Sequence, residues 1–340
     1  MTRSTRSGFA VATAVFALVV VGALAIGTLF AAGRELRSGT EAILQTRASM
    51  AAELGLERTI AAWRTEWNAI ARGYSRAFQL ATSEGASVFV RVTRLADELY
   101  LVTSEARAGP AKRQVARVVM LDLRDPRLLA AVTVNTTAEL GGDAGIDGTD
   151  RSPPGWECAP SGAAIPPVAS ADTSEILRFA QFHWDELARA ALIRVTASLT
   201  GPAPRWSAEE CDITDPNNWG EPTRSAGGPC MSYYPLIHAP GNLIIDGGRG
   251  QGLLLVDGDL TLRSGFEFSG VVLVRGALRG DVGGARLTGV VAIAAQGSTP
   301  SLLDGISIAF SRCAARKALL GVASPVPIVD RSWYEAFEQP

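Results

Sequence analysis

A long apolar segment lies close to the amino terminus of the chain. No charged residue occurs from Phe9 to Ala32, whereas Arg3 and Arg6 precede this segment and the next charge is Arg34. A helix rises about 1.5 Å per residue and about 20 residues span a bilayer, so this segment is long enough for one span. We therefore predict a transmembrane helix over residues 9–32, with the basic leader in the cytoplasm and the rest of the chain outside.

A cleaved secretory signal is the alternative for this segment. Ala23-Leu24-Ala25 has the small residues of a cleavage site and follows a shorter apolar core. Apolar residues continue to Ala32, so such cleavage would leave an apolar start to the mature chain.

Apolar residues beyond the membrane segment first follow a helical spacing. Steps of four and three predict that the helix continues to about residue 80, with Gly33 and Gly39 as soft points where it is broken at most once. The residues of this stripe are Leu56, Ile60, Trp63, Trp67, Ile70 and Tyr74.

The apolar positions then alternate, as they do in half-buried strands. Residues 87–95, 98–106 and 113–122 predict three strands, with a turn at 108–110, and residues 127–139 predict a further strand. The fold class that follows is α+β, in which the long amino-terminal helix packs on an antiparallel sheet.

Glycine-punctuated apolar runs repeat in the distal part of the chain. They begin at Gly252, Gly270 and Gly289, with periods of 18 and 19 residues, and the segment from Pro240 resembles a partial copy. Each coil of a β-helix leaves an apolar face that only its neighbours cover, so we predict a small glycine-rich β-helix-like distal domain. Residues 127–148 are a further candidate coil, and an ordinary β-meander is the alternative.

The remaining segments connect and close these parts. Residues 140–173 are dense in glycine, proline and aspartate and predict a loop, residues 173–198 predict a second helix, and short helices are expected near Ala314 and Trp333. The predicted organisation is a leader at 1–8, a transmembrane helix at 9–32, a head at 33–139, a loop-rich segment with the second helix at 140–239, a β-helix-like repeat region at 240–310 and a carboxy-terminal cap at 311–340.

Composition limits the class of partner and the compartment. The chain has 340 residues, enough for one large or two modest cores, and a net charge of -2, so no basic surface predicts a nucleic-acid partner. The four cysteines, an even number beyond a membrane anchor, predict two disulfides in an oxidising periplasm, with three connectivities open. They are Cys158, Cys211, Cys230 and Cys313, and they contain no C-x-x-C pair of the kind that binds zinc.

Several acidic residues and the two histidines are candidates for metal binding. Asp143, Asp147 and Asp150 could supply oxygens for calcium, but their spacing does not match an EF-hand loop, so polar turns are the preferred interpretation. His183 and His238 belong to different predicted elements, which disfavours a metal site.

Four aspartates of the repeat region could form an acid/base group of a glycan-cleaving enzyme. They are Asp246, Asp257, Asp259 and Asp281, and each stands beside glycine, as turn residues do. No nucleophile elbow, metalloprotease helix or phosphate-binding loop occurs in the sequence. We therefore expect no catalytic residue, no metal and no cofactor.

The basic leader, Gly8, Phe9 and the long apolar helix together resemble the type III signal of type IV pilins and pseudopilins. The segment AAELGLERTIAAW at 51–63 is similar to the alanine-rich AAE-x-GLERA segment of PilX-type pilus assembly proteins. The resemblance covers only residues 1–63. It implies cleavage by a prepilin peptidase between Gly8 and Phe9, followed by N-methylation of Phe9.

The resemblance also implies lateral packing of the helix with other pilin helices through small residues. The candidate packing positions are Ala10, Ala12, Thr13, Ala14 and Gly22. Most major pilins carry glutamate at the fifth mature position, where this chain has Thr13. The tip-forming minor pseudopilin of type II secretion departs in the same way, so a minor, initiating or tip subunit is implied.

The function that the resemblance implies is a minor pilin-like subunit of a type IV pilus or related secretion apparatus. Its partners would be other pilins, the inner-membrane assembly machinery and the prepilin peptidase. Its place would be the bacterial inner membrane, with a periplasmic carboxy-terminal domain. The alternatives are a single-span envelope protein that displays a β-helical binding module outside any filament, and an anchored glycan-cleaving enzyme.

Overall fold

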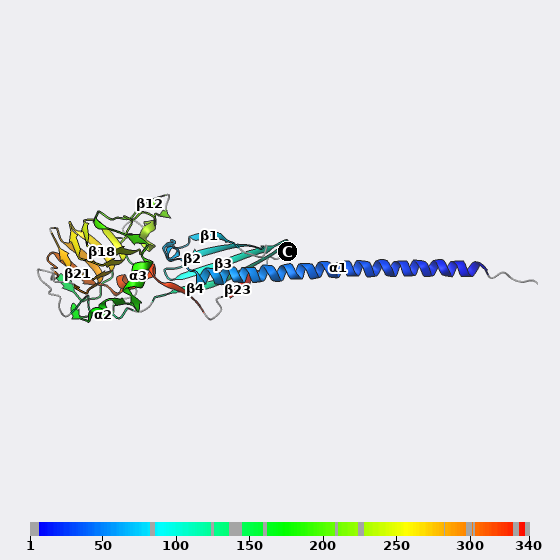
Figure 1. Ribbon diagram of the computed structural model, residues 1–340, viewed down its shortest axis with the longest axis horizontal. Helices are drawn as coiled ribbons and strands as arrows, with labels where there is room; N and C mark the ends of the chain where they lie inside the picture. Colours follow the sequence, from blue (N-terminus) through cyan, green and yellow to red (C-terminus); the bar gives the residue numbers. More distant parts are fainter. Residues whose placement is uncertain are drawn as a thin grey trace, which may run out of the picture.

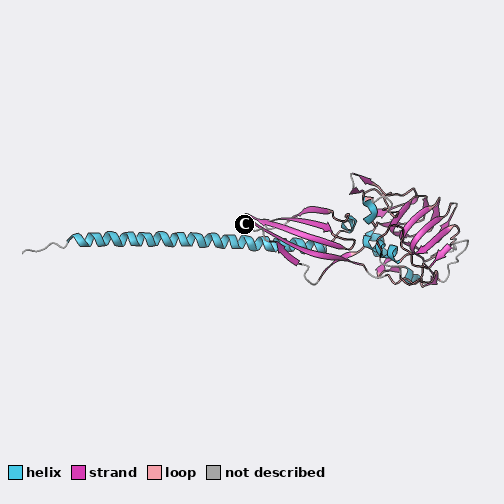
Figure 2. Cartoon of the chain, turned by 180° about the vertical axis from the view of Figure 1, so that it is seen from behind, coloured by secondary structure: helices cyan, strands magenta, loops and turns pink. Residues whose placement is uncertain are grey.

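The protein is a long helix that carries an elongated two-part body at one end (Figures 1 and 2). The computed structural model describes residues 7–81, 86–123, 126–135, 145–158, 162–207, 210–223, 228–281, 283–296, 301, 303–328 and 333–336, with side chains described from 11 to 328. The part of the body next to the helix is called the head, and the part beyond it is called the distal part.

The helix α1 runs without interruption over Ser7–Ala61. Gly33 and Gly39 do not break it. The prediction that it continues to about residue 80 was wrong, because Thr65–Ala69 forms a 3-10 turn (η1) and Ser75–Leu80 forms strand β1. The apolar spacing of this stretch serves the core of the head instead, where Trp67 and Ile70 are buried.

The head contains a six-stranded antiparallel sheet. Strands β2 (Ser87–Arg94), β3 (Leu99–Ala108) and β4 (Ala111–Asp122) confirm the three predicted strands, and β1 pairs with β2 at the edge. Gly109 has a φ of +56° in the predicted turn between β3 and β4. These elements confirm the α+β class, with the long helix packed on an antiparallel sheet.

Two segments from the carboxy-terminal end complete this sheet. Strands β22 (Ser324–Pro327) and β23 (Trp333–Ala336) both pair with β4, so the helix predicted near Trp333 was wrong. The helix predicted near Ala314 is confirmed as α4 (Arg312–Ala318), in which Ser311 Oγ accepts a hydrogen bond from the Ala314 N–H as an N-cap.

A glycine sets the distance between α1 and the sheet. A Cβ atom at Gly55 would lie 2.5 Å from Cγ1 of Val88 and 2.6 Å from Oγ of Ser104. Small residues at Ala48 and Ala52 lie buried on the same side of the helix. The helix therefore lies flat against the strands only because this face has little side-chain volume.

The distal part is built on parallel strands that follow the repeat. Its larger sheet has the order β10-β14-β16-β18-β20-β21-β6, with β5 and then β7 branching from β20, and its smaller sheet has the order β11-β15-β17-β19. All of these pairs are parallel. The strand bounds in the larger sheet are β5 Val132–Val134, β6 Gly145–Asp147, β7 Val168–Ser170, β10 Ile193–Arg194, β14 Leu236–Ala239, β16 Arg249–Val256, β18 Phe266–Val274, β20 Ala285–Ile293 and β21 Ile306–Phe310. Those in the smaller sheet are β11 Ala197–Thr200, β15 Leu243–Asp246, β17 Leu260–Arg263 and β19 Leu278–Gly280.

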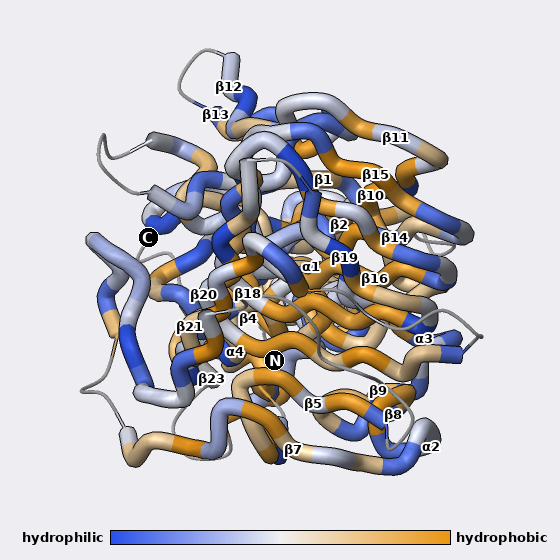
Figure 3. The backbone as a smooth tube through the Cα atoms, turned by 90° about the vertical axis from the view of Figure 1, so that its left-hand side faces the viewer, coloured by the Kyte–Doolittle hydropathy of each residue, from blue (hydrophilic) through white to orange (hydrophobic). Residues whose placement is uncertain are grey.

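The chain alternates between the two sheets, so successive repeats form a stack of coils that we call the coil stack (Figure 3). An antiparallel meander does not have this pairing. Strands β5 and β6 join the larger sheet, as residues 127–148 were suggested to do. Of the strand predicted over 127–139, the described residues up to 135 contain Val132–Val134, which lies outside the head sheet.

Aligned glycines form one corner of the coil stack. Gly252, Gly270 and Gly289 pair in register and have φ angles of +108°, +148° and +143°. A Cβ atom at Gly270 would lie 2.0 Å from the carbonyl oxygen of Gly252, and one at Gly289 would lie 1.8 Å from that of Gly270. The coils can approach each other only because no side chain stands at this corner.

Both faces of the larger parallel sheet are buried, which explains its uninterrupted apolar runs. One face lies inside the coils, where Leu254, Val272 and Val291 pack with the side chains of the smaller sheet. The opposite face, with Leu253, is covered by helices, among them α4.

The helix predicted over residues 173–198 was wrong in its length. The segment forms α2 (Thr173–Ile176), a hairpin of β8 (Arg178–Phe179) with β9 (Phe182–His183), and α3 (Trp184–Ala190). Its apolar residues still cover the sheet, but from several short elements. The remaining short elements are β12 (Trp206–Ser207), β13 (Glu210–Cys211), η2 (Pro229–Ser232) and η3 (Leu319–Gly321).

A buried arginine joins the head to the distal part. The side chain of Arg94 is fully buried, and its Nη1 donates hydrogen bonds to the carbonyl oxygens of Asn68, Ile70 and Ser232 at 2.9 to 3.2 Å. Asn68 Nδ2 in turn donates to the carbonyl oxygens of Leu320 and Ala323. A buried charge that satisfies backbone carbonyls on both sides makes separation of the two parts costly.

Gly55→Ala should destabilise the head, because the added methyl group forces Val88 and Ser104 to move. Overpacking of this kind costs roughly 1–3 kcal/mol, against a gain in helix propensity of about 1 kcal/mol. The matched control is Gly39→Ala, where nothing lies within 4 Å. Thermal unfolding of the full-length protein in detergent should show a lower midpoint for Gly55→Ala only, and equal midpoints for the two variants would contradict the close approach.

Asp97 should make the stability of this junction depend on pH. Burial raises the pKa of Asp97, but the hydrogen bond from Lys317 and the charges of Lys317, Arg94 and Arg72 outweigh burial and lower it overall. The carboxylate therefore stabilises the fold above its ordinary pKa of about 3.9, and this contribution is lost as the pH falls further.

The variant Asp97→Asn should therefore melt at a lower temperature than the wild type at neutral pH, and the difference should shrink below about pH 4. Unfolding midpoints across a pH series measure this, with Asp304→Asn on an exposed turn as the control. A difference that stays constant across the series would contradict the role of the carboxylate.

Candidate functional site

The first half of α1 is apolar and uncovered. It contains a segment long and apolar enough to cross a membrane, and none of that segment is buried in the protein. Phe16, Leu18 and Leu29 are each more than 70% exposed. An apolar surface of this size requires lipid or other helices around it, because its exposure to water is unfavourable by about 25 cal/mol per Å².

The residues predicted for processing lie at the start of this helix. Gly8 and Phe9 belong to α1, which begins at Ser7, and their side chains and that of Ala10 lie outside the described ones. The role of Gly8 and Phe9 in cleavage and N-methylation stays a prediction.

The candidate packing residues do not share one face of the helix. Ala12, Thr13 and Ala14 are exposed and Gly22 is partly covered by its own helix. At about 100° per residue, Ala12 and Ala14 point about 160° apart, to nearly opposite sides of the helix. If all of these positions pack, neighbours must lie on several sides of the helix.

A second uncovered feature, missed from the sequence, continues beyond the apolar segment. Leu36, Ile43 and Met50 are spaced by seven residues, follow Leu29 at the same spacing, and are 74%, 55% and 66% exposed. Leu54, four residues beyond Met50, is also exposed. This apolar ridge, Leu29 to Leu54, lies on a helix face that the head sheet leaves open, and its seven-residue spacing is typical of contacts between helices.

The cysteines form two disulfides. Cys158 bonds to Cys313 and Cys211 bonds to Cys230, so one of the three open connectivities is present and no cysteine is free among the described residues. The first bond ties the loop-rich segment to α4. The second holds the β12–β13 hairpin to η2.

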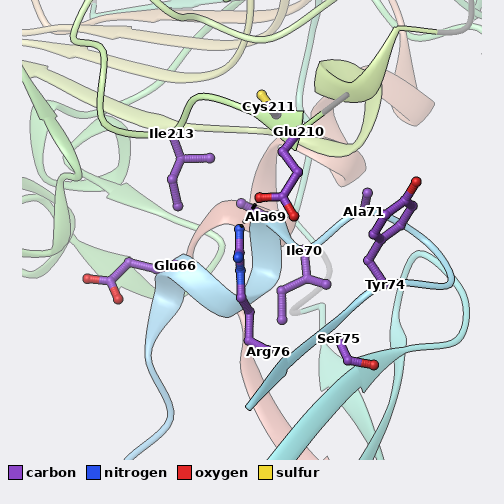
Figure 4. Close-up of a pocket in the computed structure, with 10 residues that line it drawn as sticks. All are labelled: Glu66, Ala69, Ile70, Ala71, Tyr74, Ser75, Arg76, Glu210, Cys211 and Ile213. Atoms are coloured by element: carbon purple, nitrogen blue, oxygen red, sulfur yellow. Dashed lines mark hydrogen bonds and ion pairs between the residues drawn. The ribbon is translucent and has the colours of Figure 1, made fainter. Parts of the chain in front are cut away.

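A small pocket lies where this hairpin meets the head (Figure 4). Arg76 Nη2 on β1 and Glu210 Oε2 on β13 form an ion pair at 2.9 Å across it. Its volume of 40 Å³ is enough for very few water molecules, and both charged side chains are more than half exposed. The arrangement is a contact between the two parts rather than a ligand site.

The acidic residues considered for catalysis bond to separate partners. Asp257 Oδ2 lies 3.1 Å from His238 Nε2 and its Oδ1 accepts a hydrogen bond from Trp184 Nε1. Asp259 accepts from the Ala277 N–H, Asp281 pairs with Arg263, and Asp246 accepts from Ser264. These contacts link adjacent coils.

The two histidines serve different contacts. His183 is the N-cap residue of α3 and is exposed, whereas His238 on β14 is buried beside Asp257. Within the described residues no group of three metal-binding side chains converges.

The aspartates considered for calcium also have other partners. Asp150 is buried and accepts hydrogen bonds from the N–H groups of Gly162 and Arg312, and Asp147 pairs with Arg151. Hydrogen bonds from Thr149 lower the pKa of Asp147. Asp143 lies outside the described residues.

Comparison with known proteins gives only a weak likeness among solved structures. No family model matches the chain, and no curated protein does. Among solved structures, the chain is similar to the competence-associated pilin ComZ from Thermus thermophilus, with 12% identity and a TM-score of 0.26, over 87% of this chain and 98% of that chain. A TM-score this low carries no argument about fold or function.

Ile43→Lys should prevent association of the ridge with another helix without destabilising the isolated chain. Its side chain is 55% exposed, so a lysine there meets water, whereas in a helix contact it would bury a charge. The control is Ala42→Lys, exposed and about 100° around the helix. Chemical crosslinking in the native membrane, with thermal unfolding alongside, should show loss of crosslinked species for Ile43→Lys only, and equal crosslinking would exclude the ridge.

Proposed function

We propose that this protein is a minor pilin-like subunit of a type IV pilus or a related secretion apparatus. It would be held in the bacterial inner membrane by α1 before assembly, with its amino terminus in the cytoplasm and its body in the periplasm. Its partners would be other pilins or pseudopilins, the assembly machinery of the inner membrane and a prepilin peptidase.

The observation that carries this proposal is the division of α1 into two halves. One half is fully uncovered and apolar, and the other packs on an antiparallel sheet through Gly55, with no break between them. A plain anchor needs only a span, with no rigid connection to the domain it carries. A continuous rod suits a subunit that stacks with other rods, because the position of each rod then fixes the position of its head.

A minor or tip position is supported by two features. Thr13 lacks the carboxylate that would pair with a neighbouring amino terminus in an apolar filament core, where an unpaired charge is costly. The distal part adds bulk beyond the head, at the end away from the apolar helix (Figure 1). We interpret the coil stack as a short β-helix that is displayed at this end.

Processing at Gly8 tests the proposal directly. Mass spectrometry of the membrane-extracted wild-type protein should find a chain that begins at N-methylated Phe9, and Gly8→Glu should leave Met1 or Thr2 as the first residue and remove the protein from the filament fraction. Gly33→Ala, where nothing lies within 4 Å, is the control that should behave as the wild type. An intact leader on the wild-type chain would defeat the proposal.

The alternative is a single-span envelope protein that displays the coil stack as a binding module. A hollow of 520 Å³ on the outer face of the coil stack favours a binding role, which is compatible with either function. The Gly8→Glu variant separates the two, because an envelope anchor would keep its localisation and behaviour. The glycan-cleaving alternative would need acidic side chains in one groove, and the four aspartates instead bond to separate partners.

A further inference from the structure

The outer face of the coil stack has a hollow lined by residues of α2, β8, β20 and the segment before β5. Figure 3 shows α2, β8 and β9 close together beside β5. The hollow measures 520 Å³, within the range of about 300–1,000 Å³ that is usual for small-ligand sites. Its apolar walls include Leu128, Leu129, Ile176 and Phe179. Leu129 is 49% exposed although it faces this apolar lining.

A loss of side-chain volume along one row of the repeat creates the hollow. Leu255, Leu273 and Ala292 occupy the same position on successive coils, and Thr133 follows them on β5. The first two coils carry leucine at this position, beneath the covering helices. The third coil and β5 carry the smaller residues Ala292 and Thr133 there. Ala292 and Thr133 therefore form part of the lining of the hollow.

The rim of the hollow carries two arginines and one glutamate, Arg127, Arg178 and Glu175. Arg178 Nη2 lies 3.3 Å from His183 Nε2. Neither Arg127 nor Glu175 has an ion pair or side-chain hydrogen bond with another residue in the described part of the chain. The rim therefore has an excess positive charge and a guanidinium group available to an anion.

The turn beside the hollow is strained. Ala180 and Gln181 have φ angles of +48° and +67°, and neither is glycine or asparagine. Two consecutive positive φ angles of this kind are unfavourable and occur where surrounding contacts enforce them, often at ligand sites. Both residues line the hollow, so the contacts that enforce this turn also fix the position of the wall.

We propose that this hollow binds an anionic amphiphile, with its apolar body over Ala292 and its anionic group at Arg127 and Arg178. The walls accept a chain of methylene groups, and the guanidinium groups accept a carboxylate or a phosphate ester. The site is independent of the role of α1 and of filament assembly.

Calorimetric titration of decanoate into the full-length protein, held in phosphatidylcholine nanodiscs, tests the site. We expect saturable binding of one decanoate per chain after subtraction of empty discs. Ala292→Leu should weaken binding at least tenfold by raising the floor of the hollow with leucine, the residue that the two preceding coils carry at this position. Arg127→Gln should weaken binding about tenfold, as the loss of a charge-assisted hydrogen bond does.

The controls separate charge, shape and source of the ligand. Arg286→Gln removes an exposed arginine elsewhere on β20 and should leave the affinity unchanged. Decyltrimethylammonium should bind at least tenfold more weakly than decanoate, and decyl phosphate shows whether a phosphate ester is preferred to a carboxylate.

Two results would overturn the proposal. One is equal affinity for decanoate and decyltrimethylammonium, and the other is unchanged decanoate binding by Ala292→Leu with an unfolding midpoint close to that of the wild type. If Ala292→Leu does not fold, Arg127→Gln decides, and affinity equal to that of Arg286→Gln rejects the site.

Discussion

The rest of the structure depends on the continuity of α1. Its first half is apolar and exposed, its second half packs on the head sheet, and no break separates the two. At about 1.5 Å per residue, the 55 residues of α1 form a rod of about 80 Å, of which a bilayer core takes about 30 Å. Because the rod has no break, whatever surrounds its apolar half also sets the height and rotation of the head. The ridge from Leu29 to Leu54 extends the surface available for such contacts past the membrane segment.

The head and the distal part also depend on each other, because they do not follow one another along the chain as separate domains. The chain leaves the head sheet at the end of β4, builds the coil stack, and returns through α4 and η3 to β22, where Ser324 pairs with Asp122. The distal part is therefore an insertion between adjacent strands of the head sheet. The Cys158–Cys313 disulfide and the hydrogen bonds of Arg94 and Asn68 lie near these two crossings, and they hold the insertion where the entering and leaving segments meet. Burial in this region also raises the pKa of Tyr100, whose hydroxyl donates to the Asn68 carbonyl, to about 12.

The features of this fold that the sequence predicts are those encoded by a local pattern of apolar residues. The apolar helix, the strands of the head and the period of the repeat could be predicted, because each is a local pattern of adequate length. The stretch from Trp63 to Leu80 could not, because its spacing of four and three suited a helix while its residues were needed in the core of the head. The second helix failed for a related reason, since Phe179 and Trp184 cover a sheet from separate short elements. The apolar ridge was visible as a seven-residue spacing, whereas the hollow required the register of the strands.

The repeat shows why register matters. The residue types allowed in each row of the coil stack depend on the atoms that the row contacts. The corner of Gly252, Gly270 and Gly289 accepts only glycine, because the backbone of a neighbouring segment occupies the space of a side chain. The outer row is constrained only by the helices that cover it. A change of volume there, from leucine to Ala292, alters the surface without altering the coils. The coil stack can thus keep its fold while the side-chain volume at one position of its outer face changes, which is what a ligand site on that face requires.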